Sequence, residues 1–263
     1  MGEAPLVLAQ ARILSDADGE CVAIERAHGK SPVLIICEHA SRTLPEHFGD
    51  LGLSEEALSS HIAWDPGALA VARAISAALD ATLIYQRFSR LIYDCNRPPS
   101  SPGAMPEISE IYSIPGNKDL TEGERHARTE ALYLPFHDAV RALIRDRQAS
   151  GQDSVIVTIH SFTPVMNGVP RPFDIGVLYD AYPELAHQLG RALSRLGLRV
   201  RYNEPYSGLA GLIYSARRHG DAHDVAYVEL EINNALLRSQ AGIVRLGRDV
   251  ARALATLTRP CKR

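Results

Sequence analysis

Residues 155–162 read VIVTIHSF, an apolar and β-branched run that ends in a histidine, a serine and a phenylalanine. A short run of this kind is typical of a strand buried on both faces of a parallel sheet. In open α/β sheets, ligands bind at the carboxyl ends of the strands, which is where His160 falls. The segment therefore predicts both a fold class and the edge of the sheet that carries a site.

Similar apolar runs recur along the chain and alternate with stretches of helical periodicity. We predict strands at Val33–Cys37, Thr82–Tyr85, Leu91–Tyr93, Val155–Ile159, Ile175–Tyr179, Leu198–Tyr202 and Ala226–Ile232. We predict helices at Ser54–Ile62, Pro66–Leu79, Thr121–Ser150, Tyr182–Leu196 and Asn234–Leu257. This alternation is typical of an α/β fold with a mainly parallel sheet. No repeat or boundary signal divides the chain, so we predict a single domain over residues 1–263.

The composition is that of an ordinary globular protein. The chain has 263 residues, of which 46% are hydrophobic and 22% charged, and its formal net charge is −3. Its one basic cluster, residues 217–219, is too short for a nucleic-acid surface, and no apolar stretch approaches the roughly 18 residues of a membrane helix. Residues 1–5 lack the basic start of a signal peptide, and the four cysteines form no CxxC pair. We expect a cytoplasmic protein that binds neither nucleic acid nor membranes, and the sequence leaves its oligomeric state open.

Residues 98–116 are rich in proline, serine and glycine and show no periodicity. A loop this long inside a compact domain is often a lid or a binding loop, and the alternative is a disordered excursion.

The longest predicted helix contains Pro135, which we expect to kink it because proline removes a helical hydrogen bond. His126, Tyr133 and His137 share one face of this helix, and we interpret them as solvated side chains.

Two other predicted strands also run into reactive side chains. Residues 38–41 (EHAS) follow the first strand, and residues 94–97 (DCNR) follow Leu91–Tyr93. A single histidine at a strand end is often an ordinary core or loop residue. His39 and His160 at equivalent ends favour one shared site, because a catalytic zinc ion takes about three nitrogen or oxygen ligands.

The last predicted strand carries Glu229, Glu231 and Asn233, which alternation places on one face. Carboxylates in a central strand are costly to bury unless they are paired, hydrogen-bonded or bound to metal. This pattern predicts a general base beside a metal, and the alternative is an edge strand with a solvated face.

Asp65 stands directly before Pro66, at the start of a predicted helix. An aspartate before a proline is ordinary helix-start chemistry, and the same carboxylate could bind a metal. The two roles do not exclude each other.

Arg97, next to Asn96, can hold a substrate carboxylate through two parallel hydrogen bonds, unless it serves a structural ion pair. Arg90 and Arg171 are further cations that suit an acidic substrate. Cys95 is a remaining candidate for a thiol nucleophile.

Five blocks of this chain together resemble the N-formylglutamate amidohydrolase family. They are EHAS at 38–41, WDPGA at 64–68, SRLIYDCNRP at 89–98, HSF at 160–162 and ELEIN at 229–233. The matched blocks run in family order from about residue 33 to 237, which is most of the chain. That family is similar in turn to zinc carboxypeptidases and aspartoacylases. The resemblance implies one three-layer, phosphorylase/hydrolase-like α/β domain with a mixed, largely parallel sheet between helices.

The resemblance also implies a metal site. His39, Asp65 and His160 are the expected ligands of Zn2+ or another divalent metal. Carboxypeptidases have a glutamate three residues after the first zinc histidine, where this chain has Arg42. The second ligand must therefore come from elsewhere, and Asp65 is the first choice with Glu38 in reserve.

The implied activity is hydrolysis of N-formylglutamate to glutamate and formate, in the context of histidine breakdown. Glu231 is the expected general base, and Glu229 could exchange roles with it. The expected substrate-binding residues are Arg97, Asn96, Arg90 and Arg171. The alternatives are a carboxypeptidase or a deacylase for another N-acyl amino acid, a ligand-binding protein without metal, and a cysteine amidase that uses Cys95.

Overall fold

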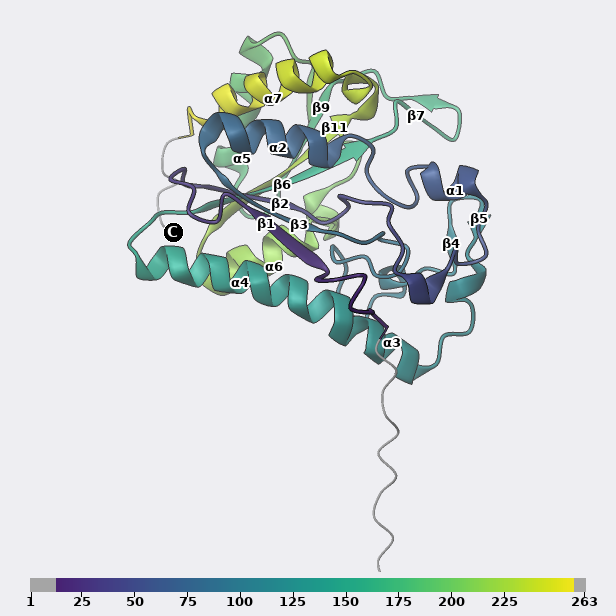
Figure 1. The fold of residues 1–263 in the computed structure, drawn as a ribbon. Helices are drawn as coiled ribbons and strands as arrows, with labels where there is room; N and C mark the ends of the chain where they lie inside the picture. Colours follow the sequence, from purple (N-terminus) through teal and green to yellow (C-terminus); the bar gives the residue numbers. More distant parts are fainter. Residues whose placement is uncertain (1–12, 258–263) are drawn as a thin grey trace, which may run out of the picture.

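The computed structural model describes residues 13–257 and is built on a seven-stranded sheet (Figure 1). In spatial order the strands are β1 (Val22–Glu25), β3 (Thr82–Gln86), β2 (Val33–Cys37), β6 (Val155–Phe162), β11 (Ala226–Asn233), β9 (Ile175–Leu178) and β10 (Val200–Tyr202). Four neighbouring pairs are parallel, whereas β1 runs antiparallel to β3 and β9 antiparallel to β11. The predicted mixed, largely parallel sheet is confirmed.

Helices cover both faces of this sheet (Figure 1). One face carries α2 (Ala68–Leu79), α5 (Pro183–Arg195) and α7 (Gln240–Leu254), and the other carries α4 (Leu134–Ala149) and α6 (Tyr214–His223). Side chains of the strands alternate between the two cores, as the strand period requires. In β2, Val33 and Ile35 pack toward α2, while Leu34 and Ile36 pack toward α4.

The smaller elements lie beside this frame. They are α1 (Glu55–Ser59), α3 (Glu122–Arg128), the hairpin β4–β5 (Ile108–Ser109 and Tyr112–Ser113) and the hairpin β7–β8 (Val165–Met166 and Val169–Pro170). Within residues 13–257, no helix combines the length and the apolar character needed to span a membrane.

The prediction of a strand at Leu91–Tyr93 is wrong. These residues form a turn, in which the amide of Ile92 donates to the carbonyl of Ser89. All three side chains are buried in the core on the α4 side. Their apolar character therefore reflects burial of a loop, which a periodicity argument cannot distinguish from a buried strand.

The long predicted helix is interrupted at the expected place. A π-helical turn, Thr129–Tyr133, separates α3 from α4, and the amide of Leu134 donates to the carbonyl of Thr129. Pro135 is the second residue of α4 and directly follows this junction.

The face of this helix that we predicted to be solvated is instead partly buried. His126 is exposed, but Tyr133 and His137 are each only 2% exposed. His137 Nδ1 lies 2.8 Å from Nε2 of His219, and its Nε2 lies 3.0 Å from the carbonyl oxygen of Cys95. The prediction failed because it did not include α6, which contributes His219 and covers this face.

We expect acid to destabilise the fold through the His137–His219 pair. Burial lowers the pKa of His137 to about 4 and that of His219 to about 2, from an ordinary value of 6.5. Below pH 6.5 the unfolded chain binds protons that the folded protein does not. The stability from these groups is therefore complete above pH 6.5 and is lost as the pH falls toward the folded-state values.

We expect the free energy of unfolding, measured with urea, to fall with pH between about pH 6.5 and 5. The fall should be up to about 1.4 kcal/mol per pH unit smaller in His219→Gln than in the wild type. The exposed His126→Gln variant serves as the control and should follow the wild type. Equal pH slopes for wild type and His219→Gln would contradict the assignment.

Candidate metal centre

Three neighbouring strands bring the polar residues of the site together at their carboxyl ends. In the parallel register of β6 and β11, Glu231 stands opposite His160 and Glu229 opposite Thr158. Both glutamates are buried, and β11 lies inside the sheet between β6 and β9. The predicted shared face is confirmed, and the alternative of a solvated edge strand is wrong.

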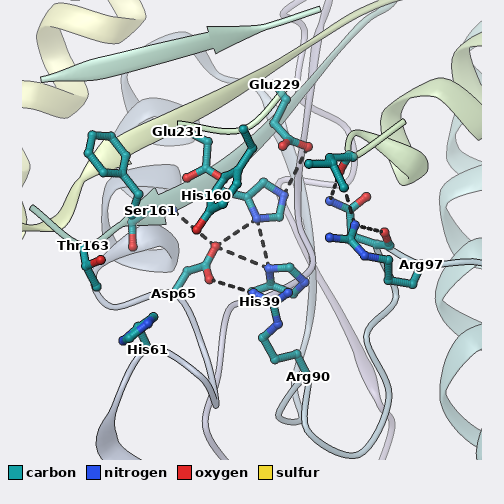
Figure 2. Close-up of a pocket in the computed structure, with 14 residues that line it drawn as sticks. His39, His61, Asp65, Arg90, Arg97, His160, Ser161, Thr163, Glu229 and Glu231 are labelled. Carbon is teal, nitrogen blue, oxygen red and sulfur yellow. Dashed lines mark hydrogen bonds and ion pairs between the residues drawn. The ribbon is translucent and has the colours of Figure 1, made fainter. Parts of the chain in front are cut away.

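His39, Asp65 and His160 form a buried group with one donor atom each directed at a common point (Figure 2). The Nδ1 atoms of the two histidines are 3.1 Å apart, and Asp65 Oδ2 lies 2.9 Å from His160 Nδ1 and 3.4 Å from His39 Nδ1. Ligands placed tetrahedrally at about 2.0–2.1 Å from zinc lie roughly 3.3 Å from one another. Two facing imidazole nitrogens and a carboxylate at these separations fit one divalent cation.

Asp65 reaches this group because the start of α2 turns its side chain away from the helix. The N-cap of α2 is Gly67, in a left-handed conformation, so the predicted capping role of Asp65 is not observed. Asp65 Oδ2 accepts a hydrogen bond from the amide of Ser161 instead. Glu38, the reserve ligand, lies nearest the opposite nitrogen of His160, at 3.2 Å from Nε2. The geometry thus favours Asp65 over Glu38.

Asp94 and Arg90 fix the side chain of His39 from the side away from Asp65 and His160. Its Nε2 lies 2.7 Å from Asp94 Oδ1, and Arg90 donates to Asp94 Oδ2 at 2.6 Å. Burial by itself would raise the pKa of Asp94, but Arg90 and His39 hold it well below its usual range. A carboxylate on the far nitrogen fixes which ring nitrogen faces a metal.

The pKa values of Asp65, His160 and Glu231 are also shifted from their ordinary values. Burial would raise the pKa of Asp65, but His39 and His160 lower it. Burial would lower the pKa of His160, but Glu229 and Asp65 raise it well above the ordinary value. For Glu231, burial is the largest effect and raises the pKa well above its usual range. A divalent cation at this position would add positive charge and favour the ionised carboxylates.

A cavity of about 150 Å³ opens onto this group (Figure 2). It is lined by His39, His61, Asp65, Arg90, Asn96, Arg97, His160, Ser161, Phe162, Thr163, Tyr206, Leu212, Glu229 and Glu231. Within the described part of the chain, Glu231 Oε2 is buried and has no hydrogen-bond partner. An unpartnered carboxylate oxygen at a cavity wall is available for proton transfer with a bound molecule.

The predicted substrate-binding residues differ in their surroundings. Arg97 lines the cavity and makes no ion pair with any residue of 13–257; its Nη1 donates to the carbonyls of Asn96 and Leu212. The side chain of Asn96 also lines the cavity, but it donates to the carbonyl of Leu212 and accepts from the amide of Ser215. Asn96 therefore ties the start of α6 to the segment that carries Arg97.

Arg90 and Arg171 are placed differently. Arg90 lines the cavity, but Asp94 occupies its Nη2 and Asp65 lies 3.5 Å from its Nη1. Arg171 is not a lining residue; its guanidinium lies over the rings of Phe162 and Tyr206, at 5.8 and 5.5 Å from the ring centres. Both rings belong to the cavity wall.

Two cavity residues, His61 and Tyr206, were not predicted from the sequence. His61 lies 2.7 Å from Glu110, which is in the turn between β4 and β5, so the 98–116 loop is ordered and contacts the edge of the cavity. Tyr206 reaches the cavity from a segment that crosses β9 at Gly176, where an added Cβ would lie 1.9 Å from the carbonyl oxygen of Glu204. Neither contact involves a motif.

The structure argues against Cys95 as a nucleophile. Its side chain is buried and does not line the cavity, and Gln86 donates to its sulfur. Burial raises the pKa of this thiol well above its usual value, which disfavours the reactive thiolate.

A mostly parallel α/β sheet with a buried His–Asp–His group and a free glutamate at its strand ends defines a hydrolase with a candidate metal site. The sequence profile of the N-formylglutamate amidohydrolases matches residues 31–238. The chain belongs to the N-formylglutamate amidohydrolase family, which confirms the resemblance found in the sequence. No curated protein matches this chain.

Two solved structures show the same fold, and a third is more distantly similar. The gene product Atu2144 from Agrobacterium tumefaciens is 49% identical, with a TM-score of 0.90 over 93% of this chain and 97% of that one. An N-formylglutamate amidohydrolase from Ralstonia eutropha JMP134 is 21% identical, with a TM-score of 0.59 over 89% and 95% of the two chains. A metallo-carboxypeptidase from Pseudomonas aeruginosa is 15% identical, with a TM-score of 0.41 over 90% of this chain and 60% of that one.

The metal site can be tested by metal analysis. After incubation with zinc and gel filtration, the wild type should retain about one ion per chain, and Asp65→Asn should retain far less because a charged ligand is lost. The exposed Asp138→Asn variant, whose carboxylate pairs with Arg141, serves as the control. Full zinc retention by Asp65→Asn would exclude Asp65 as a ligand.

Proposed function

We propose that this chain is a zinc-dependent amidohydrolase that removes the formyl group from N-formylglutamate or a related acyl group from an acidic amino acid. The observation that carries the proposal is the buried Glu231 Oε2, which has no hydrogen-bond partner within residues 13–257, beside the His39–Asp65–His160 group. A metal site and a free base at one cavity are the two parts that hydrolysis of an unactivated amide requires.

In the proposed mechanism, His39, Asp65 and His160 hold the metal. A bound zinc ion supplies Lewis acidity, which polarises the amide oxygen and lowers the pKa of water. Glu231 accepts the proton of the attacking water and then delivers it to the leaving nitrogen. Glu229 lies two residues further from the carboxyl end of β11, opposite Thr158. The Thr158 hydroxyl donates a hydrogen bond to Glu229 Oε2 at 2.9 Å. Glu231 is therefore the better placed base.

The proposed substrate is small and anionic. The cavity of about 150 Å³ suits an amino-acid derivative rather than a protein chain. Arg97 has no carboxylate partner among the described residues, so it is the cation available for a substrate carboxylate. Asn96 supports Arg97 by holding Leu212, whereas Arg171 lies behind the aromatic wall and does not line the cavity.

A hydrolysis screen tests the proposal. N-formyl, N-formimino and N-acetyl derivatives of glutamate, aspartate, glutamine and histidine should be compared, with metal content measured in the same preparation. We expect the N-formyl acidic amino acids to be hydrolysed best and Arg97→Met to raise KM about 10- to 100-fold for them, because a charge-assisted contact is lost. Preference for peptides would indicate a carboxypeptidase, and metal binding without turnover would indicate a ligand-binding protein.

The role of Glu231 predicts a distinct kinetic effect. Glu231→Gln should lower kcat by about 100- to 10,000-fold with little change in KM, because proton transfer is lost while the cavity keeps its shape. Glu184→Gln, on the exposed start of α5, provides the matched control. Wild-type turnover by Glu231→Gln would exclude Glu231 as the base.

A further inference from the structure

Glu38 is a buried carboxylate next to the His39–Asp65–His160 group, and none of the roles described so far accounts for it. It directly follows β2, only 1% of its surface is exposed, and neither of its carboxylate oxygens has a hydrogen-bond partner among the described residues. It is also absent from the residues that line the cavity. Burying a carboxylate is unfavourable unless a positive charge or a hydrogen-bond donor compensates it, so we expect such a group beside Glu38.

The donors beside it are the far nitrogen of His160 and the hydroxyl of Ser215, neither of which makes an aligned hydrogen bond among the described residues. Glu38 Oε2 lies 3.2 Å from His160 Nε2, and this Nε2 is itself buried without an aligned hydrogen bond. The two groups are therefore adjacent and complementary. Glu229 Oε2 is further from Nε2, at 3.5 Å, and already accepts from Thr158.

The contact repeats the arrangement around the first histidine. His39 directs Nδ1 at the metal group and Nε2 at Asp94, and His160 directs Nδ1 at the metal group and Nε2 at Glu38. A carboxylate on Nε2 holds the proton there, so that Nδ1 keeps its lone pair free for a cation. The two imidazoles would then be held by separate carboxylates on separate segments of the chain.

We infer that Glu38 is a positioning residue for a metal ligand: it accepts the Nε2–H of His160 and keeps Nδ1 directed at the cation. The inference rests on the proposed function only in that His160 binds a metal. Glu38 does not touch substrate, and it is not a ligand. Loss of such an outer partner typically weakens metal binding by about 10- to 100-fold.

The test measures zinc affinity of metal-free protein by competition with a chromogenic chelator, without substrate. Glu38→Met removes the acceptor at similar volume and should weaken binding about 10- to 100-fold. Glu38→Gln keeps an acceptor oxygen and should bind much more tightly than Glu38→Met, and the exposed Glu184→Gln should match the wild type. Wild-type affinity in Glu38→Met would overturn the inference, and so would an equal loss in both variants, which would mark Glu38 as a direct ligand.

A second measurement covers the case in which Glu38→Met does not fold. In 15N-labelled, zinc-loaded wild type, the Nε2–H signal of His160 should be protected from exchange, and it should shift in Glu38→Gln because the acceptor loses its charge. An unshifted signal would overturn the inference.

These results also separate the two proposals. A wild type that binds zinc but hydrolyses no acyl amino acid would refute the proposed function while leaving the role of Glu38 testable. A wild type that binds no divalent metal would overturn both.

Discussion

The close approach of two imidazole nitrogens and one carboxylate oxygen is the constraint on which the site depends. His39 and His160 turn the same ring atom toward each other at 3.1 Å, and Asp65 completes the triangle. Such a contact between two acceptor nitrogens is stable only with a shared proton or a cation between them. The carboxylates around the rings, the segment before α2 that carries Asp65, and the register of β6 with β11 all support this arrangement.

Much of this arrangement follows from strand physics and could be predicted from the sequence. The apolar runs 33–37 and 155–162 predicted parallel strands, and alternation in 226–233 predicted which side chains share a face. Parallel strands end at one edge, so His39, His160 and Glu231 were expected to meet. His160 and Glu231 were predictable because the register of β6 with β11 fixes them, and His39 because it lies two residues beyond the end of β2.

The parts that could not be predicted depend on contacts between distant segments. Burial of Leu91–Tyr93 in a turn gives the same apolar pattern as a strand, and burial of His137 depends on α6, whose sequence is too polar to suggest a covering helix. Asn96 has its polar atoms engaged by Leu212 and Ser215, more than 100 residues away in sequence. Local periodicity contains no information about such partners.

The crossing of the 203–207 segment over Gly176 has a consequence for how this protein can diversify. Because that glycine leaves space for the Glu204 carbonyl, Tyr206 can reach the cavity from outside the strands that carry the metal group. His160 and Glu231 thus belong to strands of the sheet, whereas part of the cavity wall belongs to a connecting segment. Substitutions in that segment can therefore reshape the cavity wall while His160 and Glu231 keep their places in the sheet.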